Sequence, residues 1–140
     1  MSNIQIVQEI YAAFGAGDID AILDRLAEDV RWEHWPDGSG AQRHDVPWLA
    51  ERTGRDEVAG FFEAIGALDM HTFAPIAFLE GDGDVAAVIA IDLTVTATGE
   101  RFRDEEIHLW SFGADGRVTD FRHYVDTAKH VEAYAARALA

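Results

Sequence analysis

The chain has 140 residues, the usual size of one domain, and its 49% hydrophobic content is sufficient for a buried core. Its 26 acidic and 11 basic residues give a formal net charge of −15, which disfavours binding to nucleic acid or to anionic membranes. The sequence contains no cysteine, so disulfides, thiolate metal sites and cysteine nucleophiles are excluded. The N-terminus lacks the basic and apolar regions of a signal peptide, and no apolar stretch is long enough to span a bilayer. We therefore expect a cytoplasmic protein without nucleic-acid or membrane partners.

Helical periodicity dominates the first half of the chain, where apolar side chains recur every three or four residues. The elements predicted there are a helix over 3–16, a second helix capped by Asp18, a short strand over 30–34, an irregular segment over 36–54 and a third helix starting at Gly54–Glu57. The third helix is expected to pack Phe61, Phe62 and Ile65 against a sheet. In the short strand, alternation places Trp32 and His34 on one face.

From residue 72 onward the period of the apolar pattern changes to two, which is typical of strands. The pattern predicts strands at about 73–80, 84–97, 101–112 and 117–125, followed by a helix over 127–138. Helices followed by an antiparallel meander indicate the α+β class and not a parallel α/β fold.

Five segments resemble the ketosteroid-isomerase-like superfamily, also called SnoaL-like or nuclear-transport-factor-2-like. They are Tyr11–Asp18, Leu26–Trp32, Thr53–Phe62, His108–Phe112 and Phe121–Thr127, in that order along the chain. The resemblance implies a single SnoaL-like domain over residues 1–140. In this family a cone-shaped, curved antiparallel sheet is wrapped by about three N-terminal helices and encloses a pocket. It also implies a homodimer through the convex face, and strand 84–97 is apolar on both faces, as expected of a covered sheet.

Ketosteroid isomerase uses an acidic base and an oxyanion hole made by a tyrosine and a protonated aspartic acid. Aligned through the same segments, its base falls on His34, its oxyanion acid on His108, and its tyrosine on Ile10 or Tyr11. Histidines at both acidic positions argue against steroid isomerisation by the same groups. Histidine side chains can nevertheless transfer protons, so the positions are still compatible with a catalytic site.

Three histidines are the predicted catalytic residues: His34, His108 and His123. Alternation places Glu106 and His108 on one strand face, and a histidine titrates near neutrality, which suits general acid–base catalysis. The residues expected to line the pocket and bind substrate are Tyr11, Trp32, Trp35, Trp48, Phe62, Glu106, Trp110 and Phe121. Trp48, beside Pro47, is a candidate for a pocket lid or a dimer contact.

The other histidines, His44, His71 and His130, are expected at the surface or in loops. No His-x-His or His-Glu-x-x-His spacing occurs, so the sequence predicts neither a metal site nor a cofactor. No glycine-rich phosphate loop and no Gly-x-Ser-x-Gly motif is present.

Two classes of function remain open. The first is a cofactor-free enzyme of the isomerase, dehydratase or cyclase type that acts on a small, apolar, carbonyl-bearing metabolite by histidine acid–base catalysis. The second is a non-catalytic domain of the same fold that binds a hydrophobic ligand. An enzyme requires proton-transfer groups within reach of each other, whereas a carrier requires only apolar walls.

Overall fold

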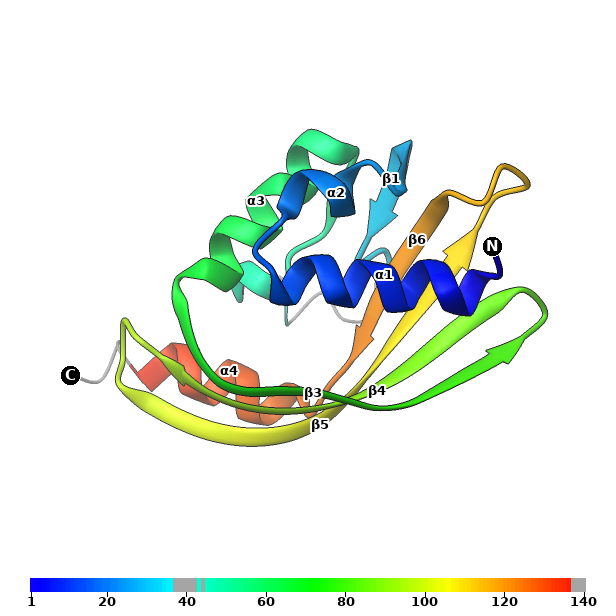
Figure 1. The fold of residues 1–140 in the computed structure, drawn as a ribbon. Helices are drawn as coiled ribbons and strands as arrows, with labels where there is room; N and C mark the ends of the chain where they lie inside the picture. The colour runs from blue at the N-terminus through cyan, green and yellow to red at the C-terminus, as the bar shows by residue number, and fades with distance from the viewer. Residues whose placement is uncertain (37–42, 44, 137–140) are drawn as a thin grey trace.

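The computed structural model describes residues 1–36, 43 and 45–136. It has an α+β fold in which a curved, open, six-stranded sheet carries helices on its concave side (Figure 1). The elements are α1 (Asn3–Gly15), α2 (Ile19–Leu23), β1 (Leu26–Trp32), the 3₁₀ helix η3 (Pro47–Leu49), β2 (Arg52–Thr53), α3 (Arg55–Gly66), β3 (Leu68–Gly81), β4 (Asp84–Val95), β5 (Glu100–Phe112), β6 (Val118–Tyr124) and α4 (Thr127–Ala135). The predicted fold class is therefore confirmed.

The strand order across the sheet is β2-β1-β6-β5-β4-β3. Strands β3 to β6 form the expected antiparallel meander. Strand β1, however, pairs with β6 in parallel, so the sheet is mixed and not wholly antiparallel. A parallel pair requires a long connection between its strands, and here that connection includes α3 and the meander itself.

Two strands have wrong predicted boundaries. Strand β3 begins at Leu68, whereas the two-residue period suggested a start at about 73. The first strand is the second case. It runs from Leu26 to Trp32, whereas alternation suggested 30–34, and the helix before it ends at Leu23. Leu26 is fully buried and is paired with Val118 of β6. A buried leucine after an amphipathic helix fits both a helix face and the start of a strand, so the apolar pattern could not place this boundary.

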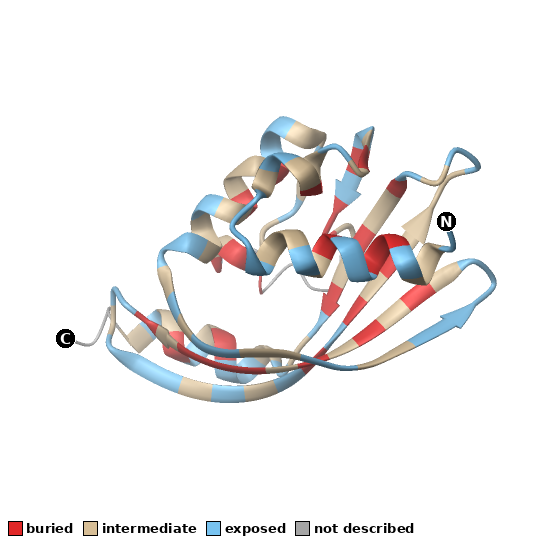
Figure 2. Ribbon diagram, viewed as in Figure 1, coloured by how far each residue is buried: buried red, intermediate tan, exposed pale blue. Residues whose placement is uncertain are grey.

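The buried face of the sheet is the concave one. Burial alternates along β4, where Val85, Ala87, Ile89 and Ile91 are buried while their neighbours are less so (Figure 2). The edge strand β3 has register shifts at two points along its pairing with β4. Such irregularities bend a strand, and they allow β3 to curve around the helices (Figure 1).

Helix α3 packs against β1 and β3, and it buries Val58 and Phe61. Phe62 and Ile65 also contact the core but are partly exposed. Helix α4 packs against β5. Within the described residues, no helix combines the length and apolarity needed to cross a bilayer.

Candidate active site

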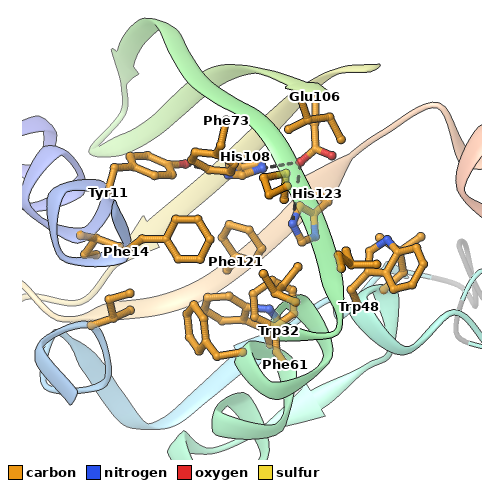
Figure 3. Close-up of a pocket in the computed structure, with 18 of the residues that line it drawn as sticks. Tyr11, Phe14, Trp32, Trp48, Phe61, Phe73, Glu106, His108, Phe121 and His123 are labelled. Atoms are coloured by element: carbon orange, nitrogen blue, oxygen red, sulfur yellow. Dashed lines mark hydrogen bonds and ion pairs between the residues drawn. The ribbon is translucent and has the colours of Figure 1, made fainter. Parts of the chain in front are cut away.

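A cavity of about 60 Å³ lies between the concave face of the sheet and helices α1 and α3 (Figure 3). Its walls are mainly aromatic and aliphatic. The structure places nine of the predicted site residues in its lining: Tyr11, Trp32, Trp48, Phe62, Glu106, His108, Trp110, Phe121 and His123. Among the lining residues, Phe14, Phe62 and Phe73 are partly exposed, whereas the histidines and Glu106 are buried. The polar groups therefore lie at the closed end of the cavity.

Strands β5 and β6 position these polar groups. Glu106, His108 and Trp110 alternate along β5, and all three are at most 5% exposed. His108 is paired directly with His123 of β6, and Trp110 with Phe121. Residues opposite each other on antiparallel strands point to the same face, so the two histidine rings meet with centroids 4.8 Å apart.

A chain of hydrogen bonds runs from Trp110 through Tyr11 and His108 to Glu106. The indole N–H of Trp110 donates to the Tyr11 oxygen over 3.0 Å. The Tyr11 hydroxyl is then available to donate to Nδ1 of His108, at 2.7 Å. This assignment puts the hydrogen of the His108 ring on Nε2, which donates to Oε2 of Glu106 over 2.6 Å.

Burial and hydrogen bonding together shift the pKa values along this chain. Burial is the main effect that lowers the pKa of His108, against the opposing effect of the hydrogen bond to Glu106. Burial also raises the pKa of Tyr11, which keeps the phenol protonated and able to donate. For Glu106, burial acts to raise the pKa, but the hydrogen bond and the charge of the surrounding histidines outweigh it and lower the pKa.

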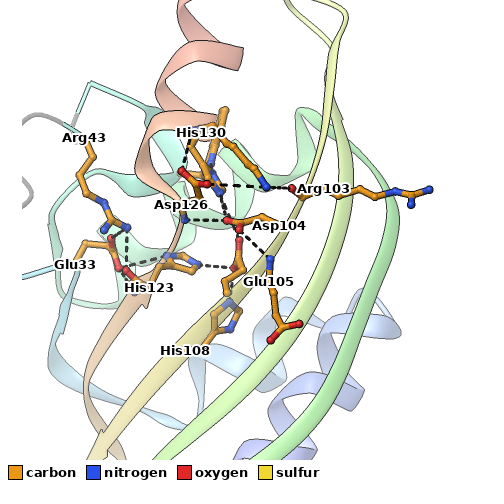
Figure 4. Close-up of polar contacts among 12 residues, drawn as sticks. Glu33, Arg43, Arg103, Asp104, Glu105, His108, His123, Asp126 and His130 are labelled. Atoms are coloured by element: carbon orange, nitrogen blue, oxygen red, sulfur yellow. Dashed lines mark hydrogen bonds and ion pairs between the residues drawn. The ribbon is translucent and has the colours of Figure 1, made fainter.

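Glu33 is a buried residue of the site that the sequence analysis missed (Figure 4). It is fully buried and has a positive φ of 61°, which turns its side chain inward directly after β1. Its Oε1 accepts the backbone N–H of His123 over 2.5 Å and lies 3.3 Å from Nδ1 of the same residue. Its Oε2 forms an ion pair with Arg43 at 3.2 Å. Glu33 and Arg43 therefore lie directly behind His123.

The structure leaves the Nε2 of His123 available on the cavity side. Among the described residues, the carboxylate that faces this nitrogen is Glu106, whose Oε2 lies 4.0 Å away, beyond hydrogen-bond distance. No hydrogen bond to Nδ1 is formed within the described residues either, although Glu33 lies beside it. His123 is thus the histidine of the cavity with an unengaged ring nitrogen.

His130 is a third histidine of the cavity, and its predicted surface location is wrong. It is only 1% exposed and lies on α4. The indole N–H of Trp48 donates to its Nδ1 over 3.0 Å, so Nε2 carries the hydrogen and donates to Asp104 over 3.1 Å. Trp48, proposed as a lid or dimer contact, is itself buried by this contact. Glu106 lies 3.8 Å from His130.

His34 and Trp35 do not lie in the cavity, contrary to prediction. The Nε2 of His34 lies 3.0 Å from the carbonyl oxygen of Arg52, and its Nδ1 faces Glu51 at 3.2 Å. The inward turn at Glu33 breaks the strand alternation, so the residue after it points away from Trp32. Trp35 instead packs edge-on against Tyr124.

Of the other histidines, His71 hydrogen-bonds Thr94 and is exposed as expected. His44 lies outside the described residues.

The fold and the site together place titratable side chains in an apolar cavity enclosed by a curved sheet and helices. The chain belongs to the SnoaL-like domain family, whose family model matches residues 7–121. It is similar to an NTF2-like protein of unknown function from Burkholderia pseudomallei K96243, with 31% identity, coverage of 95% of this chain and 98% of that chain, and a TM-score of 0.76.

Two further solved structures share the fold at lower identity. One is a Pseudomonas putida KT2440 protein provisionally assigned as a polyketide cyclase. It has 21% identity and a TM-score of 0.73, and the match covers 95% of this chain and 98% of that chain. The other is a Bacillus subtilis protein provisionally assigned as an isomerase. It has 18% identity and a TM-score of 0.71, and the match covers 97% of both chains. No curated protein matches the chain.

Proposed function

We propose that this chain is a small-molecule enzyme of the isomerase, dehydratase or cyclase type, which transfers a proton on an apolar, carbonyl-bearing metabolite. The observation that carries the proposal is the hydrogen-bonded Tyr11–His108–Glu106 chain beside the unengaged Nε2 of His123, all in one apolar cavity. The names of the cyclase and isomerase that share the fold support the same reaction class.

In this proposal His123 is the general base. Its Nε2 has no hydrogen-bond partner among the described residues, and Glu33 behind the ring favours a hydrogen on Nδ1. This leaves the lone pair of Nε2 open to the cavity, where it can accept a proton from the carbon next to a carbonyl group. The same nitrogen can return that proton to a different carbon, which completes an isomerisation without any other reactant.

Tyr11 is the proposed donor to the carbonyl oxygen. Its raised pKa keeps the hydroxyl protonated, and the indole of Trp110 together with the ring of His108 fixes its oxygen in place. A fixed donor in an apolar cavity stabilises the negative charge that develops on the oxygen when the neighbouring carbon loses a proton. The Tyr11 hydroxyl has one hydrogen, so a bound carbonyl oxygen would take this hydrogen bond in place of Nδ1 of His108, while the indole of Trp110 keeps the Tyr11 oxygen in position.

The cavity favours a neutral, flat and largely apolar substrate. Trp32 and Phe121 stack at 4.1 Å between ring centroids and form one flat wall. A volume of 60 Å³ accommodates only a few water molecules, so a ring-sized ligand must displace side chains. Several lining residues are only partly buried, and a ligand could displace their side chains towards solvent. Among them are Phe14, Phe62, Met70 and Phe73.

The proposal is tested by hydrogen–deuterium exchange at carbon. A panel of small cyclic and aryl ketones is incubated in D₂O with the protein, and loss of the proton signal next to the carbonyl is followed by NMR. The wild-type protein is expected to accelerate exchange for at least one class of ketone. His123→Ala and Tyr11→Phe should each slow it by roughly 10²–10⁴-fold. His34→Ala is the matched control, and it should leave the rate unchanged.

One outcome of the same experiment would contradict the proposed enzyme activity. If ketones bind, as measured by quenching of tryptophan fluorescence, but wild-type protein and His123→Ala give the same exchange rate, the chain is a hydrophobic-ligand-binding domain. The nearly all-apolar lining outside the polar end is the feature that favours this second function.

A further inference from the structure

Three buried side chains at the closed end of the cavity form a possible metal-ligand set. Glu106 and His108 come from β5 and His123 from β6, each is at most 5% exposed, and one ligand atom of each lies within 4.8 Å of the others. We propose that these residues bind a divalent first-row transition-metal ion, with Zn²⁺ and Co²⁺ as the probes. This inference rests on the arrangement of the ligand atoms and not on the proposed activity.

The distances require only a small shift. Two ligand atoms bound tetrahedrally to Zn²⁺ at about 2.0–2.1 Å are separated by about 3.3 Å. In the structure, Oε2 of Glu106 is 2.6 Å from Nε2 of His108 and 4.0 Å from Nε2 of His123. These two distances lie on either side of the tetrahedral value. A movement of the Glu106 carboxylate by less than about 1 Å, from His108 towards His123, therefore makes them equal.

Both histidines lie beside oxygen atoms that could accept the second ring N–H of a metal-bound histidine. A metal-bound histidine donates its second ring N–H to an acceptor, which fixes its orientation. Glu33 lies 3.3 Å from Nδ1 of His123, and the Tyr11 oxygen lies 2.7 Å from Nδ1 of His108. His108 has only to transfer its hydrogen from Nε2 to Nδ1 to present a lone pair to the ion.

The charge of the site also favours a cation. The groups within ion-pair distance of Glu106 in the described part of the chain are all histidines, and none is a permanently charged lysine or arginine. A buried carboxylate without a permanent positive partner is costly, and a bound cation removes this cost. The three protein ligands would leave a fourth coordination position facing the cavity, as in catalytic zinc sites.

A second group of possible ligands, formed by Asp104, Glu106 and His130, shares Glu106 with the first. It is less suitable because both ring nitrogens of His130 are already engaged, by Trp48 and by Asp104. Neither group has a local metal-binding motif, because strand pairing and helix packing bring its members together.

The test measures binding of Zn²⁺ and Co²⁺ to the full chain after treatment with a chelator. Calorimetry with Zn²⁺ should give one site per chain, and Co²⁺ should give the visible absorption of a four-coordinate complex. His123→Ala should lower the affinity by at least about 100-fold, and Glu33→Gln by roughly 10–100-fold as the loss of an outer partner. His34→Ala should bind as the wild type does. Circular dichroism shows whether each variant is folded. If His123→Ala does not fold, His123→Gln replaces it.

Absence of stoichiometric binding at submillimolar Zn²⁺ would overturn the proposal. So would binding that His123→Ala leaves intact, including binding that is lost only in His130→Ala and therefore belongs to the second group. The result is separable from the proposed activity. Ketone exchange without metal binding refutes this site alone, whereas metal binding without exchange supports the site and leaves the activity unsupported.

Discussion

The buried pair of Glu33 and Arg43 allows the structure to be tested independently of any ligand. Glu33 is 0% exposed and Arg43 is 5% exposed. Besides the ion pair, the Arg43 guanidinium donates to the backbone carbonyl of His123 over 2.9 Å. The pair thus connects residue 43 to β6 at the point where the polar end of the cavity begins (Figure 4). Glu33→Ala is the perturbation that tests this connection.

The expected cost of Glu33→Ala follows from what it leaves behind. It orphans the backbone N–H of His123, and it leaves Arg43 buried without its carboxylate partner. Breaking a buried ion pair from one side costs about 3–5 kcal/mol. Alanine retains the unfavourable positive φ at this position, so no relief of backbone strain offsets the loss. For a chain of this length, the cost corresponds to a decrease in Tm of about 10–17 °C.

The measurement is urea unfolding followed by circular dichroism, with Tm as a second readout. Glu28→Ala, at an exposed position of β1, is the matched control and should change stability little. Arg43→Met combined with Glu33→Ala should recover part of the loss, because the uncompensated charge is removed. A decrease below about 1 kcal/mol for Glu33→Ala, or a double variant no more stable than additivity predicts, would show that the pair is not buried as described.

Two further predictions concern packing and assembly. Phe62→Ala should lower the free energy of unfolding by clearly less than the about 3–5 kcal/mol expected for Phe61→Ala. The reason is that Phe61 is buried, whereas Phe62 is partly exposed at the cavity. Urea unfolding compares the two variants directly, and equal losses of stability would contradict this placement. We also propose a homodimer through the outer sheet face, where Ile107 and Tyr124 are paired and each is more than 40% exposed. Sedimentation should give a dimer for the wild type and a monomer for Ile107→Asp. A wild-type monomer at micromolar concentration would refute this proposal.

The meander and its contribution to the site could be predicted from the sequence. Along β5 and β6 the two-residue period is regular through the site region, so the shared face of Glu106, His108 and Trp110 follows from counting. The pairing of His108 with His123 depends on the turn between the strands and on a register shift beside it, between Ser111 and Phe112. Periodicity predicts the shared face of each strand, whereas the exact register also requires this irregularity.

The region around Glu33 and His34 could not be predicted in the same way. Alternation requires extended backbone, and Glu33 leaves it with a φ of 61°. Glutamate rarely adopts this conformation, and nothing in the neighbouring sequence marks it. The inward turn is stabilised by Arg43 and by the backbone of His123, which lies 90 residues further along the chain. The contacts that stabilise this turn are therefore tertiary and cannot be inferred from local sequence. Simple alternation pointed His34 into the site, whereas the structure points Glu33 there.

His130 is an intermediate case, because part of its signal was present. On α4 it is one helical turn from Ala133, which is also buried, while Lys129 and Glu132 occupy the exposed face. Helical spacing thus places His130 on the inner face of the helix. What the spacing does not provide is the element against which this face packs, and the contacts with Asp104 and Trp48 depend on that.

Glu106 connects the two proposals, because a proton and a metal ion would compete for the same atoms. In the hydrogen-bonded state, His108 donates to Glu106 and the Tyr11 hydroxyl is held by His108. In the metal-bound state, the ion takes the place of the proton between Glu106 and His108. His123 then loses the lone pair that the proposed base requires. The two states therefore exclude each other in one molecule, and an ion that binds as proposed must act on the proton-transfer reaction as an inhibitor competing for His123.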